Sequence, residues 1–190
     1  MNEPSSVLNP AKPVDATLLA RFVAWEERVT LGFNRVNHRQ TVSMFFGAIS
    51  RLGDGVFWYL LMAAMLVLDG AAALEPVIVM ILAGLSCTLS YKWLKHTTSR
   101  PRPCQRNATI RLTMPPLDLY SFPSGHTLHA VCFSVVAATY YPTLGPGLIG
   151  FTLLVAVSRL VLGLHYLSDV IAGAIIGGTL AFAGLYLATI

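Results

Sequence analysis

Five long apolar segments restrict the fold of this chain more than any other feature of its sequence. They cover residues 56–74, 76–94, 123–141, 146–164 and 167–190. Each is close to the roughly 20 residues that a helix needs to cross the hydrocarbon core of a bilayer. An open sheet cannot leave its edges in lipid, and the sequence lacks the alternating pattern of a membrane barrel. We therefore expect an all-α fold, a polytopic membrane helix bundle with five to six spans.

The composition of the chain agrees with a membrane location. Charged residues make up 12% of the sequence, whereas soluble globular domains carry about 25%, and the mean hydropathy is +0.63. The net charge of +4 is modest, and aromatic residues do not alternate with basic ones as in proteins that bind single strands. We expect no nucleic-acid partner. The three cysteines show no CxxC spacing, which argues against a disulfide framework.

The first 40 residues differ from the apolar segments. Residues 1–15 are polar and contain three prolines, so we expect a flexible tail and no cleavable signal peptide. Residues 16–40 place apolar side chains at helical spacing among charged ones, which favours an amphipathic helix at the membrane surface. The alternative is a helix that packs on the rest of the protein. Residues 16–190 are expected to form a single membrane-embedded domain.

Polar and charged residues gather in three stretches of the second half. These are 95–103 (KHTTSRPRP), 123–126 (PSGH) and 158–169 (SRLVLGLHYLSD). Because successive spans cross the bilayer in alternating directions, all three stretches are predicted to lie at the same membrane face. An ionisable group in a membrane costs several kcal/mol unless it is paired or hydrated. We therefore expect the three stretches to form one site.

The residue types in these stretches suit an anion. Arginine carries a planar fork of donors that matches phosphate oxygens. Ser124 and Gly125 stand where the third span begins, and the unpaired N–H groups of a helix start attract negative charge. From residue 95 onward the only carboxylates are Asp118 and Asp169, too few for a two-metal phosphatase. We expect metal-independent chemistry, with Asp118 as a loop or capping residue.

Two histidines have the spacing expected of reactive groups. His165 and Asp169 are four residues apart, so on a helix they would share a face. A carboxylate can fix the tautomer of an imidazole and leave its other nitrogen free to attack. His126, from another span, could protonate a leaving oxygen. His129 is expected to be a packing histidine, and Arg100 to face water or to contact a second phosphate.

Together the three stretches resemble the type-2 phosphatidic acid phosphatase and vanadium haloperoxidase superfamily. The signature of that superfamily is K-x6-RP, then PSGH, then SR-x5-H-x3-D. The matching residues here are Lys95, Arg102-Pro103, Pro123-Ser124-Gly125-His126, Ser158-Arg159, His165 and Asp169. The resemblance covers residues 95–169 by motif and leaves residues 1–50 uncovered.

The resemblance implies a role for each matched residue. His165 would be the nucleophile that forms a phosphohistidine, Asp169 would orient it, and His126 would protonate the leaving group and later activate water. The residues that would hold the phosphoryl oxygens are Lys95, Arg102, Ser124, Gly125 and Arg159. The resemblance implies no metal and no other cofactor for the phosphatases.

The implied activity is metal-independent dephosphorylation of a lipid phosphate or diphosphate. Candidate substrates are undecaprenyl pyrophosphate, phosphatidylglycerol phosphate, phosphatidic acid and a lipid A phosphate. A phosphotransferase that uses the same site and a vanadate-dependent haloperoxidase are the alternatives. The only implied partners are the lipid substrate and membrane lipids, and the sequence carries no signal for the oligomeric state.

The resemblance also implies a multi-pass protein of the bacterial inner membrane. The predicted loops opposite the site, residues 69–76 and 141–147, contain no Lys or Arg. Taken literally, the positive-inside rule would place the site in the cytoplasm. Resemblance to bacterial lipid phosphatases instead favours a periplasmic site, which we expect.

Overall fold

The computed structural model describes residues 16–190, and the predicted flexible tail lies outside this range. Eight α-helices follow one another: α1 (Ala16–Asn34), α2 (Gln40–Arg51), α3 (Phe57–Asp69), α4 (Leu74–Thr98), α5 (Pro103–Arg106), α6 (Gly125–Tyr140), α7 (Gly145–Val161) and α8 (Leu167–Ala188). Short helical turns connect several of them: η1 (Arg35–His38), η2 (Leu52–Val56), η3 (Gly70–Ala73) and η4 (Pro142–Leu144). No strand occurs in residues 16–190, so the predicted all-α class is confirmed.

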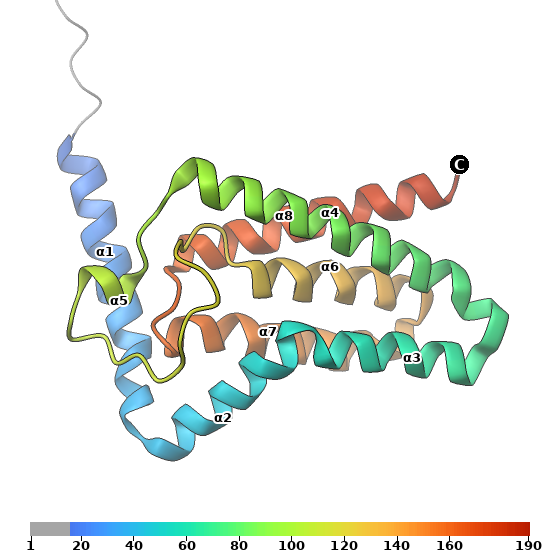
Figure 1. Cartoon of the computed structure of the whole chain (residues 1–190), viewed down its shortest axis with the longest axis horizontal. Helices are drawn as coiled ribbons and strands as arrows, with labels where there is room; N and C mark the ends of the chain where they lie inside the picture. The colour runs from blue at the N-terminus through green and yellow to red at the C-terminus, as the bar shows by residue number, and fades with distance from the viewer. Residues whose placement is uncertain (1–15) are drawn as a thin grey trace, which may run out of the picture.

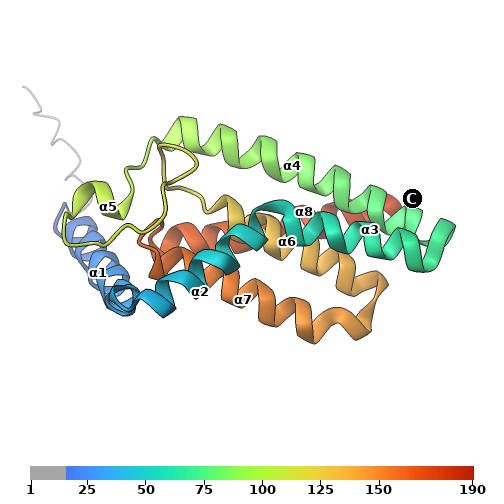
Figure 2. The same cartoon turned by 60° about the horizontal axis from the view of Figure 1, so that its bottom comes forward.

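Among residues 16–190, three helical stretches are long and apolar enough to cross a membrane: Gln40–Arg106, Pro142–Val161 and Leu167–Ala188. The first contains α2 to α5 and reverses direction between α3 and α4 (Figures 1 and 2). Many large apolar side chains on these helices face outward, including Leu60, Val67, Leu82, Leu89, Leu153, Ile175 and Phe182. An apolar surface of this extent is what a lipid environment would cover.

The RLGDG sequence at residues 51–55 coincides with a kink between α2 and α3. η2 is a turn of π-helix that joins α2 directly to α3, and its backbone departs from helical geometry at Asp54 and Gly55. The expected first span, residues 56–74, therefore corresponds to the second half of a kinked helix that begins at Gln40. The two helices therefore meet at a kink, where Gly55 adopts a positive φ of +127°.

Helix α6 lies at the centre of the bundle and packs against α4, α7 and α8 (Figure 1). The core around it contains Trp58 of α3, Met80 of α4, Val136 of α6 and Val155 of α7. A Cβ atom at Gly177 of α8 would collide with the carbonyl oxygen of Leu128, so this glycine permits the backbones of α6 and α8 to touch. Small residues on a helix face permit this close packing in membrane proteins.

Helix α1 crosses one end of the bundle and packs against α7 and α8 (Figure 1). Glu26, Thr30 and Asn34 of this helix are buried, while Leu18, Phe22 and Trp25 remain exposed. The side-chain amide of Asn34 donates hydrogen bonds to the carbonyls of Arg111 and Val161. One face of α1 therefore packs on the rest of the protein, which was the alternative to a surface helix. The opposite face exposes apolar side chains, and its contact with the membrane surface stays a prediction.

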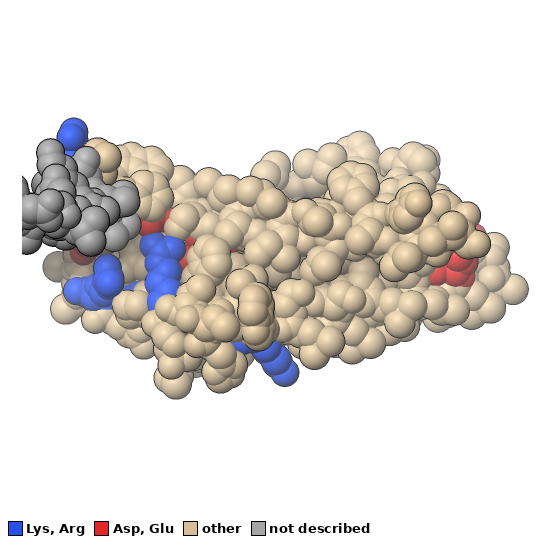
Figure 3. Space-filling model, turned by 90° about the horizontal axis from the view of Figure 1, so that it is seen from above, with Lys and Arg blue, Asp and Glu red and all other residues tan. Residues whose placement is uncertain are grey.

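The end of α4, the start of α6 and the turn between α7 and α8 meet at the end of the bundle beside α1 (Figures 1 and 2). On the face drawn in Figure 3, Lys and Arg side chains gather toward one end, and most of the remaining surface is uncharged. The three polar stretches of the sequence thus come together at one end of the molecule, as alternation of the spans predicted.

Candidate active site

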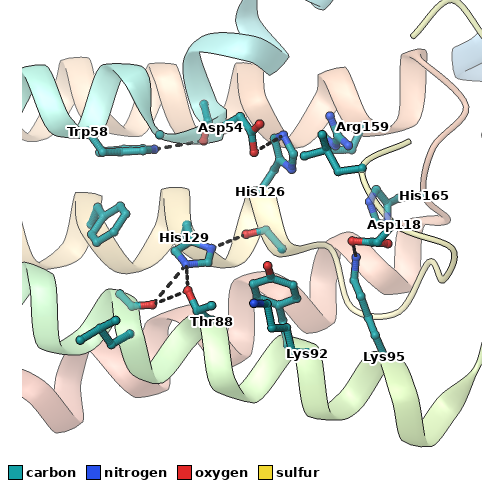
Figure 4. A pocket seen from close by; sticks show the side chains of 18 of the residues that line it. Asp54, Trp58, Thr88, Lys92, Lys95, Asp118, His126, His129, Arg159 and His165 are labelled. Carbon is teal, nitrogen blue, oxygen red and sulfur yellow. Dashed lines mark hydrogen bonds and ion pairs between the residues drawn. The ribbon is translucent and has the colours of Figure 1, made fainter. Parts of the chain in front are cut away.

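A cavity of about 860 Å³ opens at this end of the bundle (Figure 4). Of the eight predicted site residues, six line it: Lys95, Arg102, Gly125, His126, Arg159 and His165. Ser124 and Asp169 are fully buried and do not line it. The other part of the wall is apolar and includes Trp58, Met62, Ile81, Leu85 and Phe133. The cavity therefore joins a cationic end to an apolar end.

Asp118 bridges two of the cationic side chains. Its carboxylate lies 2.5 Å from Nζ of Lys95 and 2.6 Å from Nη2 of Arg102. Arg102 also donates to the carbonyl of Leu164, and it is 1% exposed. Although burial opposes it, the contact with Lys95 and the nearby Arg102 hold the pKa of Asp118 below its usual value. Asp118 was expected to be a loop or capping residue, but here it is part of the charge network of the cavity.

Arg159 supplies a third cation from the last turn of α7. It is 4% exposed, and Nη1 donates to Oγ of Ser50 in α2. Its Nε finds no hydrogen-bond partner among residues 16–190. A buried donor without a partner is rare in native structures. An anion bound in the cavity would supply the missing acceptor.

His165 and Asp169 are adjacent, but not on one helix as we expected. Helix α7 ends at Val161, and His165 lies in the turn before α8, whereas Asp169 lies in the first turn of α8. Gly163, at φ +70°, reverses the chain between the two helices. Nδ1 of His165 is 3.5 Å from Oδ2 of Asp169. The close contact of this pair therefore comes from a turn and not from helical spacing.

Asp169 is held by two donors, whereas Nδ1 of His165 has no hydrogen-bond partner among residues 16–190. Asp169 accepts hydrogen bonds from the backbone N–H of Tyr166 and from Nη1 of Arg100. Burial lowers the pKa of His165 well below its ordinary value, and the nearby cations Arg159 and Arg102 add to this effect. The imidazole is therefore neutral near pH 7, as a nucleophile requires.

Helix α6 presents His126 to the cavity from its first turn. Ser124 is the N-cap residue, and its side chain accepts a hydrogen bond from the N–H of Thr127. The backbone N–H of Ser124 donates to the carbonyl of Asp169, which ties α6 to α8. Ser124 is therefore occupied in holding the helix start, while Gly125 and His126 face the cavity.

Several residues around the site gave no clear signal in the sequence. Arg100 is neither water-facing nor free, because it pairs with Asp169 and with the buried carboxylate of Glu26. Asp54 lines the cavity, with Oδ1 3.3 Å from Nε2 of His126 (Figure 4). A carboxylate inside an apolar segment is a recognisable sign of a functional site, but Asp54 was not among the expected site residues.

His129 is a packing histidine, as expected, although it also lines the cavity. Its Nδ1 lies 2.9 Å from the carbonyl of Gly125. Its Nε2 lies 3.1 Å from Oγ1 of Thr88. Because both ring nitrogens have partners within the helices, this ring is held in place.

The arrangement as a whole can bind a multiply charged oxyanion between two imidazoles. Three buried cations line the polar end, and His165 and His126 line the same space. Among residues 16–190 no three His, Cys, Asp or Glu side chains lie close enough together to hold a metal ion.

Comparison with known proteins places this geometry in a family. The sequence model of the PAP2 superfamily matches residues 72–189. The transmembrane PAP2-type phosphatidylglycerolphosphate phosphatase of Bacillus subtilis is similar in structure, with a TM-score of 0.73 and 22% identity over 88% of this chain and 86% of that one. LpxE of Aquifex aeolicus has a TM-score of 0.71 and 27% identity over 81% of this chain and 92% of its own. No curated protein matches. Because the superfamily model matches more than half of its length, the chain belongs to the PAP2 superfamily.

Proposed function

We propose that this protein is a membrane-embedded phosphatase that removes phosphate from a lipid phosphate or diphosphate. The observation that carries the proposal is the cavity, in which Lys95, Arg102 and Arg159 share a wall with the apolar side chains of α3 and α4. A phosphate group fits the cationic end, and an acyl or prenyl chain fits the apolar end. The superfamily membership and the Bacillus subtilis relative, which is named for a phospholipid phosphatase activity, support this substrate class.

The reaction we propose has two steps and uses no metal. Nε2 of His165 attacks phosphorus while the bond to the leaving oxygen breaks, and His126 donates a proton to that oxygen. His126, now neutral, then takes a proton from water as the water oxygen attacks the phosphohistidine. The bond between phosphorus and His165 breaks, inorganic phosphate leaves, and both imidazoles return to their starting states. Asp169 orients His165, and the cations and Gly125 stabilise the charge on the phosphoryl oxygens.

The membrane placement is also part of the proposal. We assign five spans to α2–α3, α4, α6, α7 and α8, and place the protein in the bacterial inner membrane with the cavity on the periplasmic side. The outward-facing apolar side chains of these helices support the spans. Cysteine labelling of intact cells tests the orientation in a variant without native cysteines. Thr109→Cys, an exposed residue near the site, should react with an impermeant maleimide, whereas Thr143→Cys at the other end should not.

A substrate panel tests the activity. The purified protein in detergent, with a metal chelator present, should release phosphate from at least one of phosphatidic acid, phosphatidylglycerol phosphate, undecaprenyl pyrophosphate and a lipid A phosphate. His165→Ala should abolish phosphate release, because the variant lacks the proposed nucleophile. A requirement for divalent metal, or full activity in His165→Ala, would refute the mechanism.

The same panel separates the two alternatives. Appearance of labelled phosphate on a second lipid, in place of free phosphate, would identify a phosphotransferase. Oxidation of halide by peroxide after addition of vanadate would identify a haloperoxidase. We expect vanadate to inhibit phosphate release, because it resembles the five-coordinate state of phosphorus during transfer.

A further inference from the structure

Asp54 stands out among the residues of the cavity that the proposed function leaves without a role. It belongs to η2, outside the residues that the PAP2 sequence model matches. Its side chain is 46% exposed and lines the cavity. Oδ1 lies 3.3 Å from Nε2 of His126, whose side chain is 11% exposed. An ionisable group in an apolar helix is costly unless it has a partner, and His126 is that partner.

The backbone around Asp54 is shaped for this contact. Gly55 has φ +127°, a conformation that residues with a side chain rarely adopt. A Cβ atom at Gly53 would lie 2.7 Å from Cγ2 of Val155, so only glycine lets η2 approach α7 this closely. Nε1 of Trp58 donates to the carbonyl of Gly53 and fixes the turn from the other side. Both glycines of the GDG sequence thus serve to hold Asp54 beside His126.

The charges around His126 explain why a carboxylate is needed there. To act as an acid, His126 must carry a proton and a positive charge. Arg159 of α7 and Lys95 of α4 line the same cavity as His126, and their positive charges oppose a charge on its imidazole. Asp118 cannot offset this repulsion, because its carboxylate is bound to Lys95 and Arg102.

We propose that Asp54 is a positioning residue that holds His126 in the protonated state and orients it toward the leaving oxygen. The proposal rests on the proposed function, in which His126 is the general acid. In the first step the proton passes from His126 to the leaving oxygen as the bond to phosphorus breaks. In the second step His126 takes a proton from the attacking water, and the negative charge of Asp54 stabilises the imidazolium that forms.

A leaving-group comparison tests this role, because protonation matters for an alkoxide and much less for a stable phenolate. Two substrates with the same long alkyl chain are compared, an alkyl phosphate and a nitrophenyl phosphate. General acid catalysis contributes roughly 100- to 10,000-fold. We expect Asp54→Asn to lower kcat for the alkyl phosphate by about 30-fold or more, and kcat for the nitrophenyl phosphate by about threefold or less.

Three further variants make the result decisive. His126→Ala should show the same discrimination between leaving groups, only larger. Ser50→Ala, in the neighbouring helix α2, loses the contact with Arg159 and should lower kcat for both substrates by the same factor. Asp69→Asn removes a carboxylate at the distant end of α3 and should leave both rates unchanged.

The outcomes separate failure of the inference from failure of the proposed function. If His126→Ala discriminates between the leaving groups and Asp54→Asn does not, the role of Asp54 is refuted while His126 remains the acid. Equal losses on both substrates in Asp54→Asn would likewise refute it and indicate a purely structural residue. If the wild-type protein hydrolyses neither substrate, or His126→Ala shows no discrimination, the proposed function itself fails.

Discussion

At the scale of single residues, two of the three cations of the site are paired with a carboxylate of the protein. Asp118 occupies the donors of Lys95 and Arg102 that we assign to phosphate. A phosphate group that binds to these two side chains must therefore displace a carboxylate. Removal of that carboxylate should favour anion binding for two reasons. It removes a competitor for the donors, and it leaves two neighbouring cations without a counter-charge.

The Asp118→Asn variant tests this competition. We expect the inhibition constant of vanadate to fall by about tenfold, which corresponds to about 1.4 kcal/mol. The measurement is inhibition of phosphate release, with Asp69→Asn as the control for a carboxylate outside the cavity. Weaker inhibition by vanadate in Asp118→Asn would show that the carboxylate holds the cations for phosphate and does not compete with it.

The lowered pKa of His165 makes a second residue-scale prediction. The neutral, nucleophilic form persists as pH falls below 6.5 and disappears only when pH passes through the lowered pKa. The acidic limb of kcat/KM, measured between about pH 4.5 and 8, should therefore lie below the ordinary histidine value. The second ionisation of the substrate phosphate, near pH 6, must be titrated separately and divided out. An acidic limb at or above the ordinary value would contradict this expectation.

At the scale of elements, the sequence predicted the long helices better than the segments that connect them. Four of the five expected spans match α4, α6, α7 and α8 to within a few residues, because long apolar runs mark helices clearly. The Gly-Asp-Gly sequence coincides with the kink between α2 and α3, but nothing in the sequence pattern indicated the contact of Asp54 with His126. The turn that carries His165 was missed because four-residue spacing suits a helix and a capped turn equally.

The contact between α6 and α8 supports a prediction about this element pair. Gly177→Ala should lower the free energy of unfolding by about 1–3 kcal/mol, because the new Cβ would force the backbones of α6 and α8 apart. Gly178→Ala is a matched control on the same helix, since its Cβ would meet the nearest atom, of Val131, at an ordinary 3.8 Å. Thermal unfolding in detergent measures both, and equal stability of the two variants would refute the packing argument.

At the scale of the whole molecule, helix α1, which crosses the end of the bundle, contacts residues that hold the site in place. Glu26 of α1 is fully buried and accepts hydrogen bonds from Arg100 and from the backbone N–H of Ser168. Arg100 in turn contacts Asp169, which lies beside His165. A chain of contacts thus runs from the N-terminal helix to the proposed nucleophile. The sequence predicted that the three motifs meet. An ion pair between distant segments, such as that of Glu26 and Arg100, produces no recognisable pattern in the sequence.

The Glu26→Gln variant tests this long-range support. Loss of the buried charge should lower the midpoint of thermal unfolding, by an amount that corresponds to about 1–3 kcal/mol. It should also reduce kcat, because Arg100 would hold Asp169 less firmly. Glu27→Gln is the matched control, since its neighbour Asn107 can still donate to a glutamine oxygen. Unchanged stability and activity in Glu26→Gln would show that α1 is dispensable for the site.

The position of the cavity, with one wall of cations and another of apolar helix surface, has a consequence for how the protein meets its substrate. A lipid that reaches this cavity arrives by lateral diffusion within a leaflet. The encounter frequency is then set by its mole fraction among neighbouring amphiphiles, and not by its amount per volume of solution. Inert detergent or phospholipid added at a fixed total amount of substrate lowers the mole fraction of substrate in the membrane or micelle. Turnover in this protein is accordingly a property of the surrounding bilayer as much as of the chain.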